Sequence, residues 1–238
     1  MKLLLVGGSG IVGTLVAPIL AETHQLRIFD LRAPLANVGD FRQGDVSDFE
    51  ALRQAVVDMD AVVYMAMGNL KWTETSGVVS AFDVNVKGVH LALKAAHEAR
   101  ITQAVYTSSM SVYGNLTGRY FPDEDLIPDG PELYAFTKRL GEEVCQNATR
   151  LWGMNINALR LCFPLSEDKW QAQTVLGTPT IATTARDVSR AIAAALELRA
   201  AFQAFTISGD YEQKIMNMSK AKRLLGWEPL ARPTRKGE

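Results

Sequence analysis

Cysteine and histidine are both scarce in this chain, and their scarcity argues against two kinds of protein. Among 238 residues there are two cysteines, Cys145 and Cys162, and three histidines. Two thiols cannot build a disulfide framework, and the histidines lie too far apart to match the spacing of metal ligands. The sequence therefore predicts neither a disulfide-stapled domain nor a metal site, and it suits a reducing cytoplasm.

An excess of positive charge and long apolar runs are also missing. The formal net charge is -1, whereas a surface that binds nucleic acid usually needs a basic excess. No stretch approaches the roughly 20 apolar residues that span a bilayer. Gly7 and Gly8 interrupt the first apolar run too early for a signal peptide. We therefore expect a cytoplasmic protein that binds neither nucleic acid nor membrane.

The sequence does contain a regular alternation of apolar runs and amphipathic stretches. Near-continuous apolar runs separated by helices are typical of a parallel sheet covered on both faces. The pattern therefore predicts an α/β protein with a doubly wound parallel sheet, a Rossmann fold. Strands are expected near 2–7, 25–30, 41–46, 61–68, 101–109, 155–161 and 202–208, and helices near 11–22, 47–59, 76–99, 132–152 and 184–198.

The segment GGSGIVG joins the first expected strand to the first expected helix. Glycines at this spacing permit a tight turn, and they let backbone N–H groups lie against a pyrophosphate at the N-terminus of the helix. The turn is therefore a candidate dinucleotide site, with Gly7, Gly10, Ile11 and Gly13 as the cofactor-binding residues.

Charged residues follow the second and third expected strands. Asp30 ends the second strand, where a carboxylate can accept hydrogen bonds from the adenosine ribose and repel a 2′-phosphate. This position favours NAD over NADP, although Arg32 could pair with such a phosphate or simply be a solvated surface residue. Asp45 could either meet the adenine amino group or cap the helix that follows it.

A second group of candidate residues lies in LYAFTKRLGEE and TSSMSVYG. Tyr134 and Lys138 are four residues apart on an expected helix, so both project from one face. The lysine ammonium is expected to lower the pKa of the phenol, which suits proton transfer at a hydroxyl or carbonyl. Ser109, or Ser108 as the second choice, lies at the carboxyl end of a strand, where α/β sheets bind their ligands.

Together GGSGIVG, SSMSVYG, YAFTK and FDVNVKG closely resemble the extended short-chain dehydrogenase/reductase family, the NAD-dependent epimerase/dehydratase group. The resemblance implies that Tyr134 is the catalytic acid–base, that Lys138 assists it and binds the ribose, and that Ser109 polarises the substrate oxygen. It also implies a cofactor side made by Asp45, Val46, Ala66, Met67, Gly68 and Asn85. Relatives often pair through the helices near 76–99 and 132–152, so a homodimer is expected.

The same resemblance suggests how the chain is divided. Residues 1–164 would form the NAD-binding core that carries the catalytic residues, and residues 165–238 a short substrate-binding portion that includes the last core strand near 202–208. Sugar-nucleotide epimerases usually have a larger C-terminal lobe. The compact form resembles uronate dehydrogenases, which oxidise a free sugar acid.

Three residues were considered for contact with a substrate. Phe163 stands where many relatives have an asparagine, which weakens the transfer of a sugar-nucleotide contact to this chain. Lys169 is the nearest candidate cation for a substrate carboxylate, although an exposed loop lysine is the more common case. Trp72 could cap the substrate pocket or anchor its loop.

The sequence thus predicts an NAD-dependent oxidoreductase acting on a sugar or a sugar-derived hydroxyl, and a free sugar or uronate dehydrogenase is one form of it. A sugar-nucleotide epimerase with retained NAD is an alternative. A non-catalytic NAD(P)-binding sensor is another, although such proteins typically lose the Tyr–Lys pair.

Overall fold

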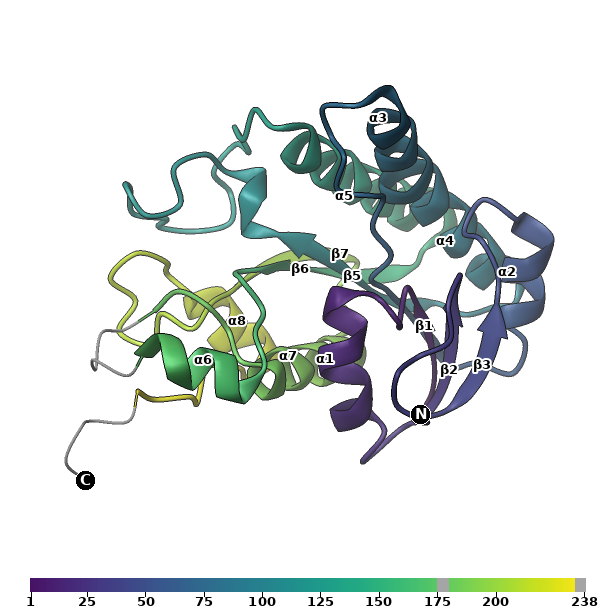
Figure 1. Cartoon of the computed structure of the whole chain (residues 1–238), viewed down its shortest axis with the longest axis horizontal. Coiled ribbons are helices and arrows are strands. Elements are labelled where there is room, and N and C mark those ends of the chain that lie inside the picture. Colours follow the sequence, from purple (N-terminus) through teal and green to yellow (C-terminus); the bar gives the residue numbers. More distant parts are fainter. Residues whose placement is uncertain (175–179, 234–238) are drawn as a thin grey trace.

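A computed structural model describes residues 1–174 and 180–233, and in this part of the chain the strands form one parallel sheet (Figure 1). The sheet has seven strands in the order β3-β2-β1-β4-β5-β6-β7. This topology confirms the predicted doubly wound α/β fold. The strands are β1 (Lys2–Val6), β2 (Gln25–Asp30), β3 (Asp40–Gln43), β4 (Ala61–Tyr64), β5 (Gln103–Ser109), β6 (Asn155–Leu161) and β7 (Phe202–Ile207).

Helices cover both faces of the sheet, as the near-continuous apolar strands require. On one face α1 (Ile11–Leu20) packs beside α7 (Ala185–Glu197), and their buried side chains form one core with alternate residues of the strands. On the other face lie α2 (Phe49–Ala55), α4 (Val89–Glu98) and α5 (Leu133–Trp152) over a second core. Figure 1 shows these two layers above and below the sheet.

The stretch expected as one helix near 76–99 contains a local change of winding. It consists of α3 (Thr75–Phe82), a π-helical segment η1 (Asp83–Gly88) and α4, which follow one another without a break. A π-helical turn holds one more residue than an α-helical turn and so re-aims its side chains. Here it carries Asn85 into the interior of the protein, where the residue is 1% exposed.

The start of α2 also differs from the sequence pattern. Ser47 followed by Glu50 is a capping box and predicts Ser47 as the cap. In the structure Asp48 caps α2 instead, because its carboxylate accepts a hydrogen bond from Ala51 N. Ser47 lies one residue earlier and donates to Asp45 Oδ1 from both its backbone N and its hydroxyl.

The residues after 164 join the same sheet and also form short helices below it. They supply β7 and α7 to the core, together with α6 (Glu167–Thr174) and α8 (Ser219–Leu225). Trp227 is buried after α8, and its indole donates to Asp187 O at 2.9 Å. The division at residue 164 therefore stays a prediction, since both parts contribute to one sheet. None of the described helices is both long and apolar enough to cross a membrane.

Candidate active site

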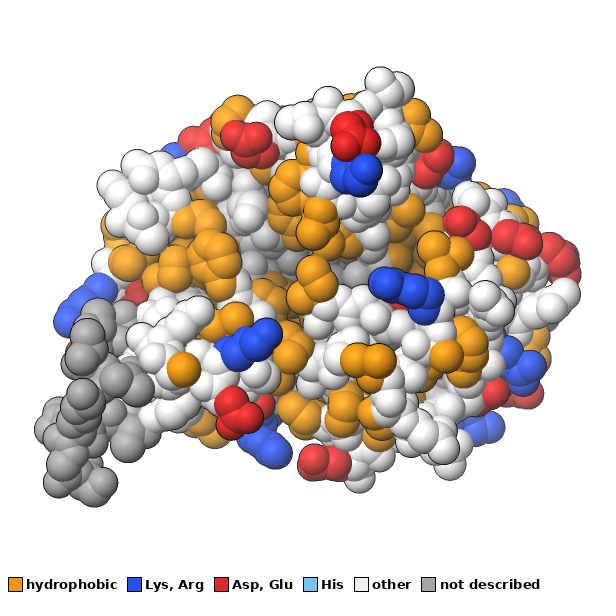
Figure 2. Space-filling model, in the orientation of Figure 1, with side chains coloured by type: hydrophobic (Ala, Val, Ile, Leu, Met, Phe, Trp, Pro, Cys, Tyr) orange, Lys and Arg blue, Asp and Glu red, His pale blue; other side chains and the backbone are white. Residues whose placement is uncertain are grey.

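A cavity of about 890 Å³ opens along the carboxyl edge of the sheet. Its walls are the segments that follow six strands, β1 to β6, together with Tyr134 and Lys138 of α5. It includes the point between β1 and β4 where the strand order reverses, which is the usual ligand site of such sheets. Figure 2 shows hydrophobic side chains gathered around a hollow on this face.

Most of the residues expected at the site line this cavity. They are Gly7, Gly10, Ile11, Asp30, Arg32, Asp45, Val46, Ala66, Met67, Gly68, Ser109, Tyr134, Lys138 and Phe163. The expected residues outside this set are Gly13, Trp72, Asn85 and Lys169.

The glycine turn after β1 is shaped by close backbone contact. Gly7 has φ +81°, and a Cβ placed on it would lie 2.3 Å from Ala66 N. A Cβ on Gly13 would lie 2.4 Å from the carbonyl carbon of Gly8, so Gly13 serves the packing of the turn against α1. Gly10 precedes the first residue of α1, and no side chain caps that end. The first N–H groups of α1 are thus left for a ligand.

Asp30 lies at the same end of the cavity and braces the turn. Its Oδ2 accepts a hydrogen bond from Ser9 N at 2.9 Å, and Arg32 N lies 3.3 Å from Oδ1. Asp45 also lines the cavity, and its carboxylate accepts hydrogen bonds from Ser47. It does not cap α2, because Asp48 does, and its contact with adenine stays a prediction. A phosphate-accepting helix end next to a ribose-accepting carboxylate fits a dinucleotide.

Asn85 lies behind the cavity wall and holds the segment at Gly68 in position. Its Oδ1 accepts a hydrogen bond from Gly68 N at 3.0 Å, and its Nδ2 donates to Thr137 Oγ1 at 2.9 Å. The side chain therefore ties the segment after β4 to helix α5, one residue away from Lys138. Asn85 itself does not line the cavity.

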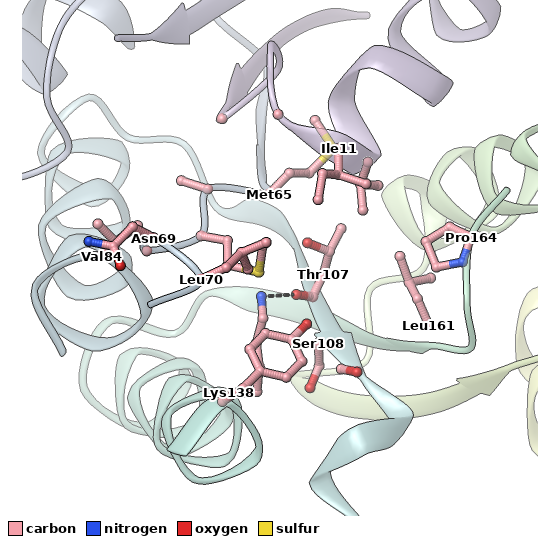
Figure 3. A pocket seen from close by; sticks show the side chains of 18 of the residues that line it. Ile11, Met65, Asn69, Leu70, Val84, Thr107, Ser108, Lys138, Leu161 and Pro164 are labelled. Carbon is pink, nitrogen blue, oxygen red and sulfur yellow. Dashed lines mark hydrogen bonds between the residues drawn. The ribbon is translucent and has the colours of Figure 1, made fainter. Parts of the chain in front are cut away.

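Lys138 points into the cavity from α5, as Figure 3 shows. Its Nζ donates a hydrogen bond to Thr107 O at 2.7 Å, the dashed line in that view. The side chain is buried, and desolvation lowers its pKa from 10.5 to about 8. Its Nζ lies 5.9 Å from the centre of the Tyr134 ring.

Tyr134 lies under an indole rather than directly against the lysine. Trp72 stacks on its ring, with 5.1 Å between the centroids and 12° between the planes. Burial raises the pKa of Tyr134 above 10.0, and only the hydrogen bond with Ser109 acts in the opposite direction. The sequence predicts that the Lys138 ammonium lowers the pKa of Tyr134. No such lowering is found in the structure, where Lys138 Nζ donates to Thr107 O.

The two candidate serines, Ser108 and Ser109, have different hydrogen-bond partners. Ser108 Oγ donates to Glu142 Oε1 at 2.6 Å in the interior, so this hydroxyl is already used. Ser109 interacts with Tyr134, and its Oγ accepts a hydrogen bond from Ser111 N at 3.1 Å. Of the two, Ser109 is the serine whose side chain is hydrogen-bonded with Tyr134.

A buried charge network beneath the cavity gave no signal in the sequence. Arg160 donates to both carboxylate oxygens of Glu142, at 2.9 and 2.7 Å, and the two side chains are 6% and 5% exposed. The same guanidinium donates to Tyr113 Oη and to Glu124 O. The network joins α5, β6 and the segment after β5. Arginine and glutamate are usually surface residues, so their types alone do not reveal it.

Lys169 lies exposed on α6 and is not one of the residues lining the cavity. Within residues 1–174 and 180–233, no group of three or more His, Cys, Asp or Glu side chains could hold a metal ion.

The fold and the site together define a dinucleotide-binding α/β protein, and the comparison with known families makes this specific. The chain belongs to the NAD dependent epimerase/dehydratase family, whose model matches residues 3–188. NAD is therefore its cofactor. The resemblance inferred from the sequence motifs is confirmed.

The sequence identity to individual relatives is low. The chain is 31% identical over 143 residues to an N-acetyl-alpha-D-glucosaminyl-diphospho-ditrans,octacis-undecaprenol 4-epimerase of Escherichia coli O157:H7, covering 60% of this chain and 42% of that enzyme. It is 28% identical over 171 residues to a UDP-glucose 4-epimerase of Lactobacillus helveticus, covering 67% and 51%. The chain thus spans about half the length of these relatives.

Among solved structures, a mutated uronate dehydrogenase superposes with a TM-score of 0.80. The alignment covers 97% of this chain and 82% of that one, at 18% identity. Such a likeness establishes the shared fold.

Proposed function

We propose that this protein is an NAD-dependent oxidoreductase that acts on a secondary hydroxyl or the corresponding carbonyl. The observation that carries the proposal is the convergence of Tyr134, Lys138 and Ser109 on the cavity that also contains the glycine turn and Asp30. When bound, NAD supplies the acceptor or donor of a hydride at the reacting carbon.

Residues of this chain fit that cofactor at several points. The N–H groups at the start of α1 and the close turn at Gly7 suit a pyrophosphate, and Asp30 suits the hydroxyls of the adenosine ribose. Lys138 is a buried cation beside the reacting residues, where it can bind the second ribose. Asn85 holds the backbone of Gly68 in the cavity wall, where it can support a bound cofactor.

The chain's own residues also account for proton movement. Tyr134 holds its proton at neutral pH, because burial raises the pKa of the phenol. It can give that proton to a carbonyl oxygen that also accepts a hydrogen bond from Ser109. In the opposite direction, the Lys138 cation stabilises the phenolate that takes a proton from a hydroxyl.

The substrate class and the destination of the hydride define the specific reaction. The sequence predicts a sugar or sugar-derived hydroxyl, and the names of the relatives favour that class, since they are sugar epimerases and a uronate dehydrogenase. An epimerase would return the hydride to the same substrate, whereas a dehydrogenase releases it with the cofactor. Cytoplasmic location and homodimerisation remain predictions.

Replacing Tyr134 by Phe tests the proposal. We expect Tyr134→Phe to lower turnover by about a thousandfold, the usual contribution of a general acid–base, while NAD still binds. Tyr120→Phe is a matched control, because Tyr120 is 50% exposed and outside the cavity lining. Turnover is followed by absorbance of reduced nicotinamide and by product analysis, and NAD binding by calorimetry. Unchanged turnover in Tyr134→Phe would favour the sensor alternative.

A further inference from the structure

The two ends of the cavity differ in charge. We call its walls after β1, β2 and β3 the cofactor end, and its walls after β5 and β6, together with Leu70 opposite them, the substrate end. The cofactor end contains Asp30, Arg32 and Asp45. At the substrate end, Lys138 of α5 is the charged side chain among the described lining residues, and its Nζ is already bonded to Thr107 O. Among the described lining residues, a carboxylate or phosphate on the substrate would therefore have at this end only Lys138, the cation that the proposed function assigns to the cofactor ribose and to Tyr134.

The substrate end is also mainly apolar. Figure 3 shows Leu161 and Pro164 on one side of it and Leu70, from the segment after β4, on the other. Met110, Leu116 and Phe163 complete this part of the wall. Thioether and branched aliphatic side chains adapt to hydrocarbon surfaces and offer a hydroxyl group almost nothing to bond.

The polar groups that remain are few and lie together. Ser109 and Tyr134 interact with each other, and Ser111 follows two residues after Ser109. Asn69 is engaged by its own segment, since its Oδ1 accepts from Lys71 N at 3.0 Å. Among the described lining residues, Ser109, Ser111 and Tyr134 suit one reacting oxygen and leave few partners for the other hydroxyls of a sugar ring, and an unpartnered hydroxyl is costly when buried.

Phe163 gives an independent sign of the same preference. Its backbone has φ +40°, a conformation that a bulky residue rarely adopts, and the residue is 56% exposed at the cavity wall. Half-exposed apolar surface and backbone strain are each unfavourable in the free protein. A ligand that covers the ring with hydrocarbon would offset the first of these.

From this wall we propose that the substrate is a secondary alcohol, or its ketone, on an uncharged and mainly hydrocarbon skeleton. This assignment rests on the proposed oxidoreductase function and departs from the sugar class that the sequence predicts. In the oxidation, the carbinol C–H bond breaks and its electron pair leaves as hydride to oxidised NAD. The O–H proton passes to the Tyr134 phenolate, and a C=O bond forms.

The test compares three compounds against the NAD-saturated full chain. Decahydro-2-naphthol is the hydrocarbon alcohol, D-glucuronate is the charged free sugar, and UDP-glucose is the sugar nucleotide. Binding is measured by calorimetry on Tyr134→Phe, in which turnover is suppressed, and oxidation by nicotinamide absorbance on the unaltered chain. We expect decahydro-2-naphthol to bind at least about tenfold more tightly than either sugar, and to be oxidised.

Phe163→Asn separates recognition from folding. Asparagine adopts a positive φ more readily than phenylalanine, so this variant should keep or raise the melting temperature. We expect it to weaken decahydro-2-naphthol binding by about five- to tenfold, because the apolar ring is lost. Leu151→Asn is the control, since Leu151 is 65% exposed near the C-terminal end of α5 and outside the cavity lining.

The outcomes distinguish the two proposals. Tighter binding of D-glucuronate or UDP-glucose, or unchanged decahydro-2-naphthol affinity in Phe163→Asn, would overturn the hydrocarbon assignment and leave the oxidoreductase proposal standing if a sugar is turned over. Tight binding of decahydro-2-naphthol without turnover of any compound would support the apolar wall and overturn the oxidoreductase function.

Discussion

The cofactor end and the substrate end of the cavity are held in shape by different parts of the chain. At the cofactor end close backbone packing holds the turn, which the Asp30 carboxylate also braces through Ser9 N. Gly7 lies so close to Ala66 that a Cβ would meet the neighbouring backbone N at 2.3 Å. Beneath the substrate end side chains hold the shape, because Arg160 donates to Glu142 and Glu142 accepts a hydrogen bond from the Ser108 hydroxyl.

This difference explains why one end is easier to predict than the other. A close backbone approach requires glycine at particular positions, so it leaves a pattern that can be found in the sequence. A buried ion pair requires only that two side chains, 18 residues apart in the chain, meet in the fold. Mutations at each end should therefore fail in different ways.

The largest effect is expected from the side-chain network. Glu142→Gln leaves the buried Arg160 guanidinium without its charge partner, and we expect the free energy of unfolding to fall by about 3–5 kcal/mol. Glu228→Gln is the matched control, because its pair with Lys222 is exposed, at 51% and 65%, and is worth about 0–1 kcal/mol. Urea unfolding of both variants measures the difference. Equal losses would show that the buried pair is not what stabilises this end.

An intermediate effect is expected from the backbone contact. Gly7→Ala combines an unfavourable φ with a clash against the Ala66 backbone, and we expect a loss of about 2–4 kcal/mol together with weaker NAD binding. Gly153→Ala has a similar φ of +66° but nothing within 4 Å of the new Cβ, so about 1 kcal/mol is expected. Urea unfolding and calorimetric NAD titration test this. Similar losses in both variants would mean that φ alone matters at Gly7.

The smallest effect per pH unit is a pH dependence at Lys138, the charged side chain of the substrate end. Its pKa falls from 10.5 to about 8 in the folded protein, so within this window the unfolded chain binds more protons than the folded one. The contribution of Lys138 to the free energy of unfolding therefore rises with pH, by up to about 1.4 kcal/mol per pH unit.

In Lys138→Met this contribution is absent. The difference in unfolding free energy between the unaltered chain and the variant should increase from about pH 8 to about pH 10. Buried tyrosines titrate in both proteins and cancel in the difference. A difference that stays constant, measured by urea unfolding at several pH values, would contradict the burial of a titrating lysine.

The order and type of the main elements followed from the sequence because strand burial and helix amphipathicity are local signals. The π-helical turn at 83–88 did not, since it depends on Asn85 finding partners at Gly68 and Thr137. The cap of α2 moved from Ser47 to Asp48 for a similar reason. Ser47 is occupied by Asp45, which precedes it in the turn.

At the candidate site, most of the residues predicted from the motifs line the cavity, but the motifs did not predict the protonation of the site. The direction of the Tyr134 pKa depends on where the Lys138 ammonium points and on what covers the phenol. Both are set by tertiary contacts, with Thr107 O and with Trp72. The i and i+4 spacing gives the shared helix face and cannot give these partners.

The stacked pair of Trp72 and Tyr134 has a spectroscopic consequence. The other tryptophans, Trp152, Trp170 and Trp227, contact His97, Ala182 O and Asp187 O, whereas Trp72 alone among them lies against the tyrosine of the site. Indole emission responds to nearby polarity and to aromatic neighbours. Any molecule that displaces water from Tyr134 changes the surroundings of one fluorophore, so the protein contains its own unlabelled reporter of occupancy.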